Sequence, residues 1–440
     1  TKLLPHKELA HAPGTLIEED ILDEKATNYL ASVYLRGDAF GLAWSDISTG
    51  EFCVYEYAGE DWRARLSDVL SSVRPSEFVC NEDFVGAYAS VPYFTASDAR
   101  PHCYHDFAYY FPTAEKKLKE ALGVASLAAF ECDDKPFAVS AAGGLCEYLS
   151  QTQKRTLAQL NSLTYLHDTS FMLLDAATRR NLEITARARD GKKTGSLLGV
   201  LDKTSTAMGA RTLRAWLDRP LRDEKAINAR LGAVEALVAS RAVRDKLNEL
   251  LGDIRDLERL SGRIAYGNAS PSVLIAVSDT LNVLPALKKV AAELKDPTLK
   301  KIVADIDPLP EEAAVLNAAL ERVNRKIDKG KDGSAGYVIK RGYDEKLDEL
   351  RDIKTTAKQW IVNLEERERE ATKVKYNRVF GYFIEVTNSF LDKVPYRYQR
   401  KQTLVGSERF VTDELKELET RILSADEEAD ALENRIFEEL

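Results

Sequence analysis

The chain has 440 residues, of which 44% are hydrophobic and 30% charged, and its formal net charge at pH 7 is −9. At roughly 150 residues per domain, this length predicts about three soluble domains. The absence of an eighteen-residue apolar run disfavours a membrane role, and the acidic balance disfavours a protein that coats nucleic acid over its whole surface. The five cysteines form no CxxC pair and the N-terminus carries no secretory pattern, so we expect reduced thiols in a cytoplasmic protein.

The first third of the sequence predicts a mixed α/β domain. Residues 28–35 and 39–57 are rich in aromatic and β-branched side chains and are separated by a turn signal, which is typical of a β-meander. Residues 76–80 predict another strand, and helical stretches such as 114–123 alternate with the strands. This alternation favours one sheet that is covered by helices.

The middle of the sequence, from about residue 140 to 340, is helical almost throughout. Asp175 and Thr206 each precede an amphipathic stretch and are predicted helix N-caps, and Pro220 is predicted to stop the second of these helices. Residues 227–251 predict one further amphipathic helix.

Two stretches of 28 residues, 343–370 and 413–440, carry apolar residues at alternating steps of four and three. Lys354 interrupts the first stripe once, whereas the second is unbroken. Their equal length, ~42 Å of helix, predicts that they pair antiparallel and carry the intervening residues to the far tip. The predicted seam consists of Tyr343, Leu347, Leu350, Ala357, Ile361 and Leu364 in the first stretch and of Leu415, Leu418, Ile422, Ala425, Ala429, Leu432 and Ile436 in the second.

The segment 371–411 between these stretches is basic and β-rich. It holds eight Lys or Arg residues against three Asp or Glu, a net charge of +5, whereas 412–440 holds three bases against eleven acids, a net charge of −8. Gly381 and Gly406 mark turns or bulges within it. We therefore predict a small β domain at the end of a two-helix lever, where Lys and Arg would neutralise the phosphates of a polyanion. A solvated basic surface is the alternative that composition leaves open.

Three local patterns suggest catalytic or ligand sites without completing them. Residues 190–199 lack the Lys-Ser/Thr pair that follows the second glycine of a phosphate loop. His102, Cys103 and His105 have no second cluster with zinc spacing. Asp46 on a predicted strand suggests a metal-dependent nuclease, but two-metal catalysis needs several converging carboxylates, so a turn-capping aspartate is the preferred interpretation.

Seven segments carry a family resemblance: PGT (13–15), DISTGEF (46–52), LDAATRRNLEI (174–184), the core motif 195–221, GYDEKLDELR (342–351), NRVFGYFIEV (377–386) and 398–419. In this order they resemble segments of the MutS family of bacterial DNA mismatch-repair proteins, and they cover nearly the whole chain. The long core motif makes the resemblance specific.

The resemblance implies a multidomain fold. It places an α/β, ribonuclease-H-like connector at 14–138, an all-α core with the ascending lever helix at 139–370, a small β-rich clamp at 371–411 and the descending lever helix at 412–440. Residues 1–13 do not match the family and are expected to be a tail of other origin. The two lever helices are expected to run antiparallel, with the clamp inserted at their tip.

The resemblance also implies a function in DNA mismatch repair. We expect the clamp to bind the backbone of double-stranded DNA without reading sequence, the lever to couple this grip to an ATPase domain, and the connector to bind MutL. The family's N-terminal mismatch-recognition domain and C-terminal ATPase domain with its Walker A loop are not matched, so no enzyme activity, ATP or Mg²⁺ is expected in this chain. Homodimers are expected of full-length members and a monomer of this chain. Two alternatives stay open, a metal-dependent nuclease centred on the first domain and a purely structural coiled-coil arm.

The same resemblance assigns candidate DNA contacts in the clamp. One group matches a first hairpin turn and the other matches, or shortly precedes, a second turn. The predicted DNA-binding residues are Lys375, Asn377 and Arg378 in the first group and Arg400, Lys401, Gly406, Ser407 and Arg409 in the second. No catalytic, cofactor or metal residues are assigned.

Overall fold

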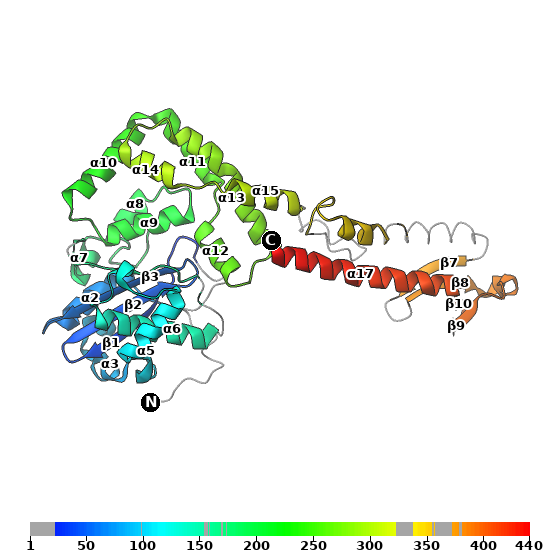
Figure 1. The fold of residues 1–440 in the computed structure, drawn as a ribbon, viewed down its shortest axis with the longest axis horizontal. Helices are drawn as coiled ribbons and strands as arrows, with labels where there is room; N and C mark the ends of the chain where they lie inside the picture. Colours follow the sequence, from blue (N-terminus) through cyan, green and yellow to red (C-terminus); the bar gives the residue numbers. More distant parts are fainter. Residues whose placement is uncertain are drawn as a thin grey trace. The chain divides into compact units, whose positions relative to one another are not determined.

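The computed structural model describes residues 23–97, 99–153, 157, 159–168, 170–172, 174–322, 338–353, 356, 372–377 and 381–440 (Figure 1). The chain divides into two compact units, Thr1–Pro310 and Glu311–Leu440.

The described part of the first unit contains one mixed sheet. Its strands are β1 (Leu30–Arg36), β2 (Ala39–Asp46), β3 (Glu51–Ala58), β4 (Glu77–Cys80), β5 (His102–Cys103) and β6 (Thr164–Tyr165), in the order β5-β4-β1-β2-β3-β6. Strands β1 to β3 form an antiparallel meander, β4 runs parallel to β1 and to β5, and β6 runs parallel to β3. The predicted meander and the predicted strand at 76–80 are confirmed.

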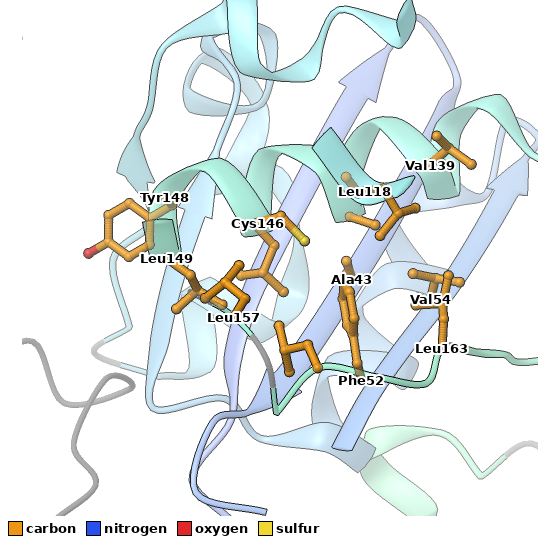
Figure 2. Close-up of a cluster of buried hydrophobic side chains, with 14 of the residues drawn as sticks. Ala43, Phe52, Val54, Leu118, Val139, Cys146, Tyr148, Leu149, Leu157 and Leu163 are labelled. Atoms are coloured by element: carbon orange, nitrogen blue, oxygen red, sulfur yellow. The ribbon is translucent and has the colours of Figure 1, made fainter. Parts of the chain in front are cut away.

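Helices cover both faces of this sheet. They are α2 (Trp62–Val73), α3 (Glu82–Ala87) and α4 (Pro92–Ala96) on one face, and α5 (Phe111–Leu122) and α6 (Pro136–Gln153) on the other. Side chains alternate along a strand, so on β3 Phe52 and Val54 join the core under α5 and α6 while Tyr55 joins the core under α2. Figure 2 shows the first of these cores, where Leu118 and Val139 lie beside the strands. The predicted arrangement of one sheet covered by helices is therefore confirmed.

Helix α6 meets the sheet with its backbone in direct contact. A Cβ atom added to Gly41 on β2 would lie 1.8 Å from the carbonyl oxygen of Phe137. The Glu56 carboxylate accepts hydrogen bonds from the backbone N–H groups of Phe137 and Ala138, both at 3.1 Å. These bonds satisfy two of the donors that a helix leaves open at its N-terminus. Glycine is thus required at position 41 because there is no room for a side chain, and not because of its backbone conformation.

The remainder of the first unit is helical. Asp175 accepts a hydrogen bond from the N–H of Thr178 at 2.6 Å, and Thr206 accepts one from Gly209 at 3.0 Å, so both predicted N-caps are confirmed. The second of these helices ends before Pro220, as predicted. The helices are α7 (Ala176–Asn181), α8 (Leu197–Leu201), α9 (Ala207–Asp218), α10 (Glu224–Ala239), α11 (Arg241–Gly252), α12 (Leu257–Ala265), α13 (Pro271–Ala291) and α14 (Pro297–Asp305). The next helix, α15 (Pro310–Ala319), belongs to the second unit from Glu311 on.

The prediction of one helix over 227–251 is wrong, because the chain breaks at Ser240. This residue has φ −104° and ψ 63°, outside the helical region, and it separates α10 from α11. The break lets α10 pack against α14 while α11 packs against α13. Tertiary packing on two different helices therefore overrides a continuous amphipathic pattern.

An ion network links α2, which packs on the sheet, to α7 and α9. The Asp218 carboxylate at the end of α9 lies 2.8 Å from the guanidinium of Arg179, 3.2 Å from that of Arg74 and 3.7 Å from that of Arg214. Arg74 ends α2 with a left-handed φ of 52° and also donates a hydrogen bond to Thr185 at 2.5 Å. Burial lowers the pKa of both Arg74 and Arg179, yet arginine stays charged in proteins. One carboxylate thus holds three cationic side chains from α2, α7 and α9.

The second unit contains two packed helices from the stretches that were predicted to pair. These are the helix at 345–353 and α17 (Asp413–Glu439). Leu347 and Leu350 share one buried cluster with Ala429 and other α17 residues. Apolar packing therefore joins the two stretches where the structure describes both.

Contacts of residues 339–353 with α17 fix the direction of the pair. Glu433 accepts a hydrogen bond from the N–H of Ile339 at 2.9 Å and forms an ion pair with Arg351 at 3.1 Å. Further along, Ile353 lines a groove together with Ile422. Residue numbers therefore rise along one helix while they fall along the other, so the described parts of the two helices are antiparallel.

The predicted seam holds for the described residues with one exception. Tyr343 is 39% exposed, because Asp344 caps the helix by accepting a hydrogen bond from the N–H of Leu347 at 2.8 Å and so leaves Tyr343 outside it. Ala357, Ile361 and Leu364 lie outside the described residues. On α17 the stripe is buried or partly buried at Leu415, Leu418, Ile422, Ala425, Ala429, Leu432 and Ile436.

Candidate nucleic-acid interface

The segment that was predicted to be basic and β-rich forms an antiparallel sheet. Its described strands are β7 (Thr372–Asn377), β8 (Gly381–Thr387), β9 (Gln399–Thr403) and β10 (Ser407–Val411), in the order β7-β8-β10-β9. We call these four strands the basic sheet. Strand β9 is one of its two edges (Figure 1).

One apolar cluster joins the basic sheet to α17. Ile384 on β8 and Phe410 on β10 are buried together with Leu415, which belongs to the first turn of the helix. The hydroxyl of Thr412 accepts a hydrogen bond from the N–H of Leu415 at 3.2 Å and caps the helix. Thr412 is also the one residue between β10 and α17. The sheet and the start of the helix therefore share a core.

Two predicted contact residues, Arg409 and Ser407, are held by the basic sheet itself. The guanidinium carbon of Arg409 lies 4.4 Å from the ring centroid of Phe383, and its Nη1 donates a hydrogen bond to Gln402 at 2.8 Å. Glu385 lies 3.8 Å from the same guanidinium, and only 19% of the Arg409 side chain is exposed. Ser407 is buried. Both residues support the sheet more directly than they offer a free surface.

Arg400 and Lys401 are the predicted contacts that the edge strand β9 exposes. The Nε of Arg400 lies 2.8 Å from the buried carboxylate of Glu408, yet 61% of the Arg400 side chain is exposed. The pairing register shifts between Arg409 and Phe410, and Lys401 falls at this irregularity with an exposed side chain. Two bases thus lie side by side in sequence on an open sheet edge.

The two predicted contact turns lie at opposite ends of the basic sheet. Asn377 pairs with Gly381 at the beginning of β8, whereas Ser407 pairs with Thr387 at its end. Strand β8 has seven residues, which span about 20 Å at ~3.3 Å per residue. The structure therefore does not bring the Asn377 end together with the Gly406 turn.

The other residues of the first group are less fully described. Lys375 pairs with Phe383 in the backbone register of β7 and β8. Arg378 lies outside the described residues.

The turn at Gly406 includes a residue that the sequence analysis missed. Asn388 donates its backbone N–H to the carbonyl oxygen of Gly406 at 3.2 Å and its side-chain amide to that of Val405 at 3.4 Å. Asn388, Val405 and Gly406 are all exposed. An asparagine directly after a strand is a turn signal, and it could have marked this position.

Within the described part of the chain, His102, Cys103 and His105 are not joined by further metal ligands. Burial and the neighbouring charge of His105 lower the pKa of His102, which favours the neutral imidazole. Across the described residues, no group of three or more His, Cys, Asp or Glu side chains is placed to hold a metal ion. None of the helices that the structure describes combines the length and apolarity that a bilayer crossing requires.

Asp46 is confirmed as a turn-capping residue. Its buried carboxylate accepts hydrogen bonds from the N–H of Asn28 at 2.8 Å and from the N–H and hydroxyl of Ser48 at 2.9 and 2.6 Å. These three bonds use both oxygen atoms. They fix the turn between β2 and β3, and both carboxylate oxygens are bound to donors of the protein itself.

We expect Asp46→Asn to lower the free energy of unfolding by about 1–3 kcal/mol, because one acceptor oxygen becomes an amide that faces donors. Urea unfolding followed by circular dichroism measures this, with Asp38→Asn in an exposed turn as the control. The same proteins should leave plasmid DNA intact in Mg²⁺ or Mn²⁺. Metal-dependent cleavage by the unaltered chain that disappears in Asp46→Asn would instead favour the nuclease alternative.

Comparison with known proteins finds matches that together span nearly the whole chain. The family described as MutS domain II matches residues 28–163, and MutS domain III matches residues 177–440. The chain is 39% identical over 435 residues to the DNA mismatch repair protein MutS of Caldanaerobacter subterraneus subsp. tengcongensis, covering 98% of this chain and 49% of the relative. Identity is 39% with the protein of the same name from Halothermothrix orenii and 40% with that from Salinibacter ruber, each covering 97% of this chain and 47% of the relative. The chain thus spans about half the length of the curated relatives it matches.

Proposed function

Because the chain belongs to the MutS family, we propose that it acts in DNA mismatch repair and that the basic sheet grips the backbone of double-stranded DNA without reading its sequence. The observation that carries this proposal is the exposed pair Arg400 and Lys401 on the edge strand β9. Cationic side chains on an open edge suit phosphate contacts, which supply affinity and position but carry no base readout.

The Gly406 turn supports the same contact. A Cβ added at Gly406 would meet no atom within 4 Å, so the turn is open to close approach by another backbone. The exposed amide of Asn388 adds a hydrogen-bond donor at this end of the sheet. We assign direct DNA contact to Arg400, Lys401 and Gly406, a second contact region to Lys375, Asn377 and Arg378, and a positioning role to Ser407 and Arg409.

The paired helices are proposed to couple this grip to an ATPase domain. A rigid element that contacts two sites can carry a change from one to the other. Helix α17 has 27 residues, or about 40 Å, with Leu415 in the core of the basic sheet and Ala429 and Ile436 packed on the other helix. We assign the clamp to 371–411 and the lever to this helix pair, with the core and connector at 139–370 and 14–138.

Partners beyond DNA follow from the family assignment as further proposals. The connector is proposed to bind MutL, and homodimers are proposed for full-length members. A purely structural arm is the competing function, and it predicts that the basic sheet has no DNA affinity.

We expect the double reversal Arg400→Glu/Lys401→Glu to weaken duplex binding regardless of sequence. Losing two phosphate contacts should reduce the slope of log affinity against log salt by about 1.8, at ~0.9 per contact. Fluorescence anisotropy with two unrelated, fully paired duplexes at several salt concentrations measures the slope.

The matched control is Arg241→Glu/Lys246→Glu, which makes the same charge change on exposed positions of α11. Because Arg400→Glu would place a second carboxylate beside Glu408, Lys401→Glu alone and Arg400→Gln are measured as well. Equal slopes of log affinity against log salt for the reversal, the control and the unaltered chain would contradict DNA binding by the basic sheet.

A further inference from the structure

A pocket of about 510 Å³ with polar and apolar lining lies in the first unit, between the sheet domain and the helices. One wall consists of the turn between β2 and β3 with residues 159–162, and the other of α9 and α12. These walls come from the two segments that match MutS domains II and III, respectively. The volume falls within the range of small-ligand sites.

More acidic than basic side chains line the pocket. Glu51 and Glu258 line the pocket, and Arg211 is the one basic residue among its described lining residues. Arg211 is buried, and Asp256 binds its guanidinium through both oxygens at 2.7 Å. Glu258 also contacts Arg211 at 2.6 Å but keeps 48% of its side chain exposed. The charge of Arg211 is therefore already matched, which leaves acceptor capacity on Glu258.

A tryptophan in the pocket lining favours a flat cationic ligand. Gln159 also lines the pocket, but its Oε1 is buried and its amide donates to the hydroxyl of Tyr266 at 2.7 Å, so this residue supports the wall. Trp216 lines the pocket with 44% of its surface exposed, and the guanidinium carbon of Arg230 lies 3.8 Å from its ring centroid. The indole therefore already attracts one guanidinium group.

We propose that this pocket binds a guanidinium group, carried by a free guanidino compound or by an arginine side chain of a peptide. A guanidinium is a flat cation with five N–H donors, so it can lie against Trp216 and donate to Glu258. An ammonium group is compact and lacks the flat face. Because the walls come from two domains, an occupied pocket also holds these domains together. This inference does not rest on DNA binding by the basic sheet.

The test uses the full chain labelled with 5-fluorotryptophan and follows the fluorine resonance of Trp216, which Trp216→Phe identifies. The probe is N-acetyl-arginine amide, and N-acetyl-citrulline amide is its neutral isostere. We expect a saturable shift with the arginine compound and at least about tenfold weaker binding of the citrulline compound. No shift, or equal binding of both compounds, would overturn the proposal.

Variants locate the bound group. Glu258→Gln should weaken binding of the arginine compound at least about tenfold, whereas Glu235→Gln on the exposed face of α10 should leave it unchanged. If Glu258→Gln proves unstable, Trp216→Leu is used instead, and binding of the arginine compound is measured by calorimetry. Binding to Trp216→Leu that is as tight as to the unaltered chain would contradict the proposed site. A short peptide with an internal arginine distinguishes the sources, since tight peptide binding supports a protein partner and selective binding of the small compound supports a free ligand.

Discussion

Asp218→Ala is expected to lower the free energy of unfolding by about 3–5 kcal/mol, because it removes the one carboxylate that holds Arg74, Arg179 and Arg214 together. The buried Arg179 would lose its ion-pair partner, while Arg74 and Arg214, with 35% and 30% of their side chains exposed, would stay partly solvated. Urea unfolding followed by circular dichroism measures the loss. Tryptophan fluorescence should report the same transition, since Trp44 and Trp62 are buried in the sheet domain.

Two further variants separate charge from packing at this site. Asp218→Asn keeps the shape and one acceptor but not the charge, so it should retain part of the stability. Arg74→Gly loses one ion pair and relieves a left-handed backbone, so its loss should be smaller than that of Asp218→Ala. A loss below about 1 kcal/mol for Asp218→Ala would show that the network does not stabilise the joint between sheet and helices.

Gly41→Ala is expected to lower the free energy of unfolding by about 3 kcal/mol, since the new Cβ would lie 1.8 Å from the carbonyl oxygen of Phe137. That oxygen belongs to the backbone of α6 and has no rotamer to change. The helix would have to move away from the sheet, and its bonds from Phe137 and Ala138 to Glu56 would be strained.

Gly86→Ala provides the matched control for this prediction. Gly86 lies on α3 at an exposed position, and a Cβ added there would meet no atom within 4 Å. This substitution should be neutral or stabilising by up to about 1 kcal/mol, because alanine is the better helix former. Similar losses at both positions would contradict the backbone contact at Gly41.

The features that sequence reasoning anticipated depend on near neighbours along the chain. Thr206 caps a helix through Gly209, three residues away, and the stripe from Leu415 to Ile436 follows helical periodicity alone. The break at Ser240 was not predicted because it depends on which helices α10 and α11 pack against. Tyr343 was misplaced for a local reason, since Asp344 begins the helix one residue later than the stripe suggested.

The candidate site was harder to predict than the fold because strand pairing decides it. Nothing local indicates that β8 lies between β7 and β10, and this order is what places Asn377 and Gly406 at opposite ends of the basic sheet. Arg409 looks like a free base in the sequence, but its cross-strand neighbours Gln402 and Phe383 hold it against the sheet. The pairing register of the strands, and not the residue type, therefore decides that Arg400 is exposed while Arg409 is held against the sheet.

Only one residue, Thr412, connects β10 to α17, so the connection between the sheet and the helix is too short to act as a flexible linker. With Thr412 capping the helix and Leu415 inside the sheet's core, the sheet cannot swivel on α17 and the two must turn as one body. Glu433 lies 21 positions beyond Thr412, or about 30 Å along the helix, so a tilt of about 5° at the sheet would displace it by about 3 Å. That distance is comparable to the contacts that Glu433 makes with Ile339 and Arg351, at 2.9 and 3.1 Å. A rotation too small to alter the sheet itself would be enough to make or break those contacts at the other end.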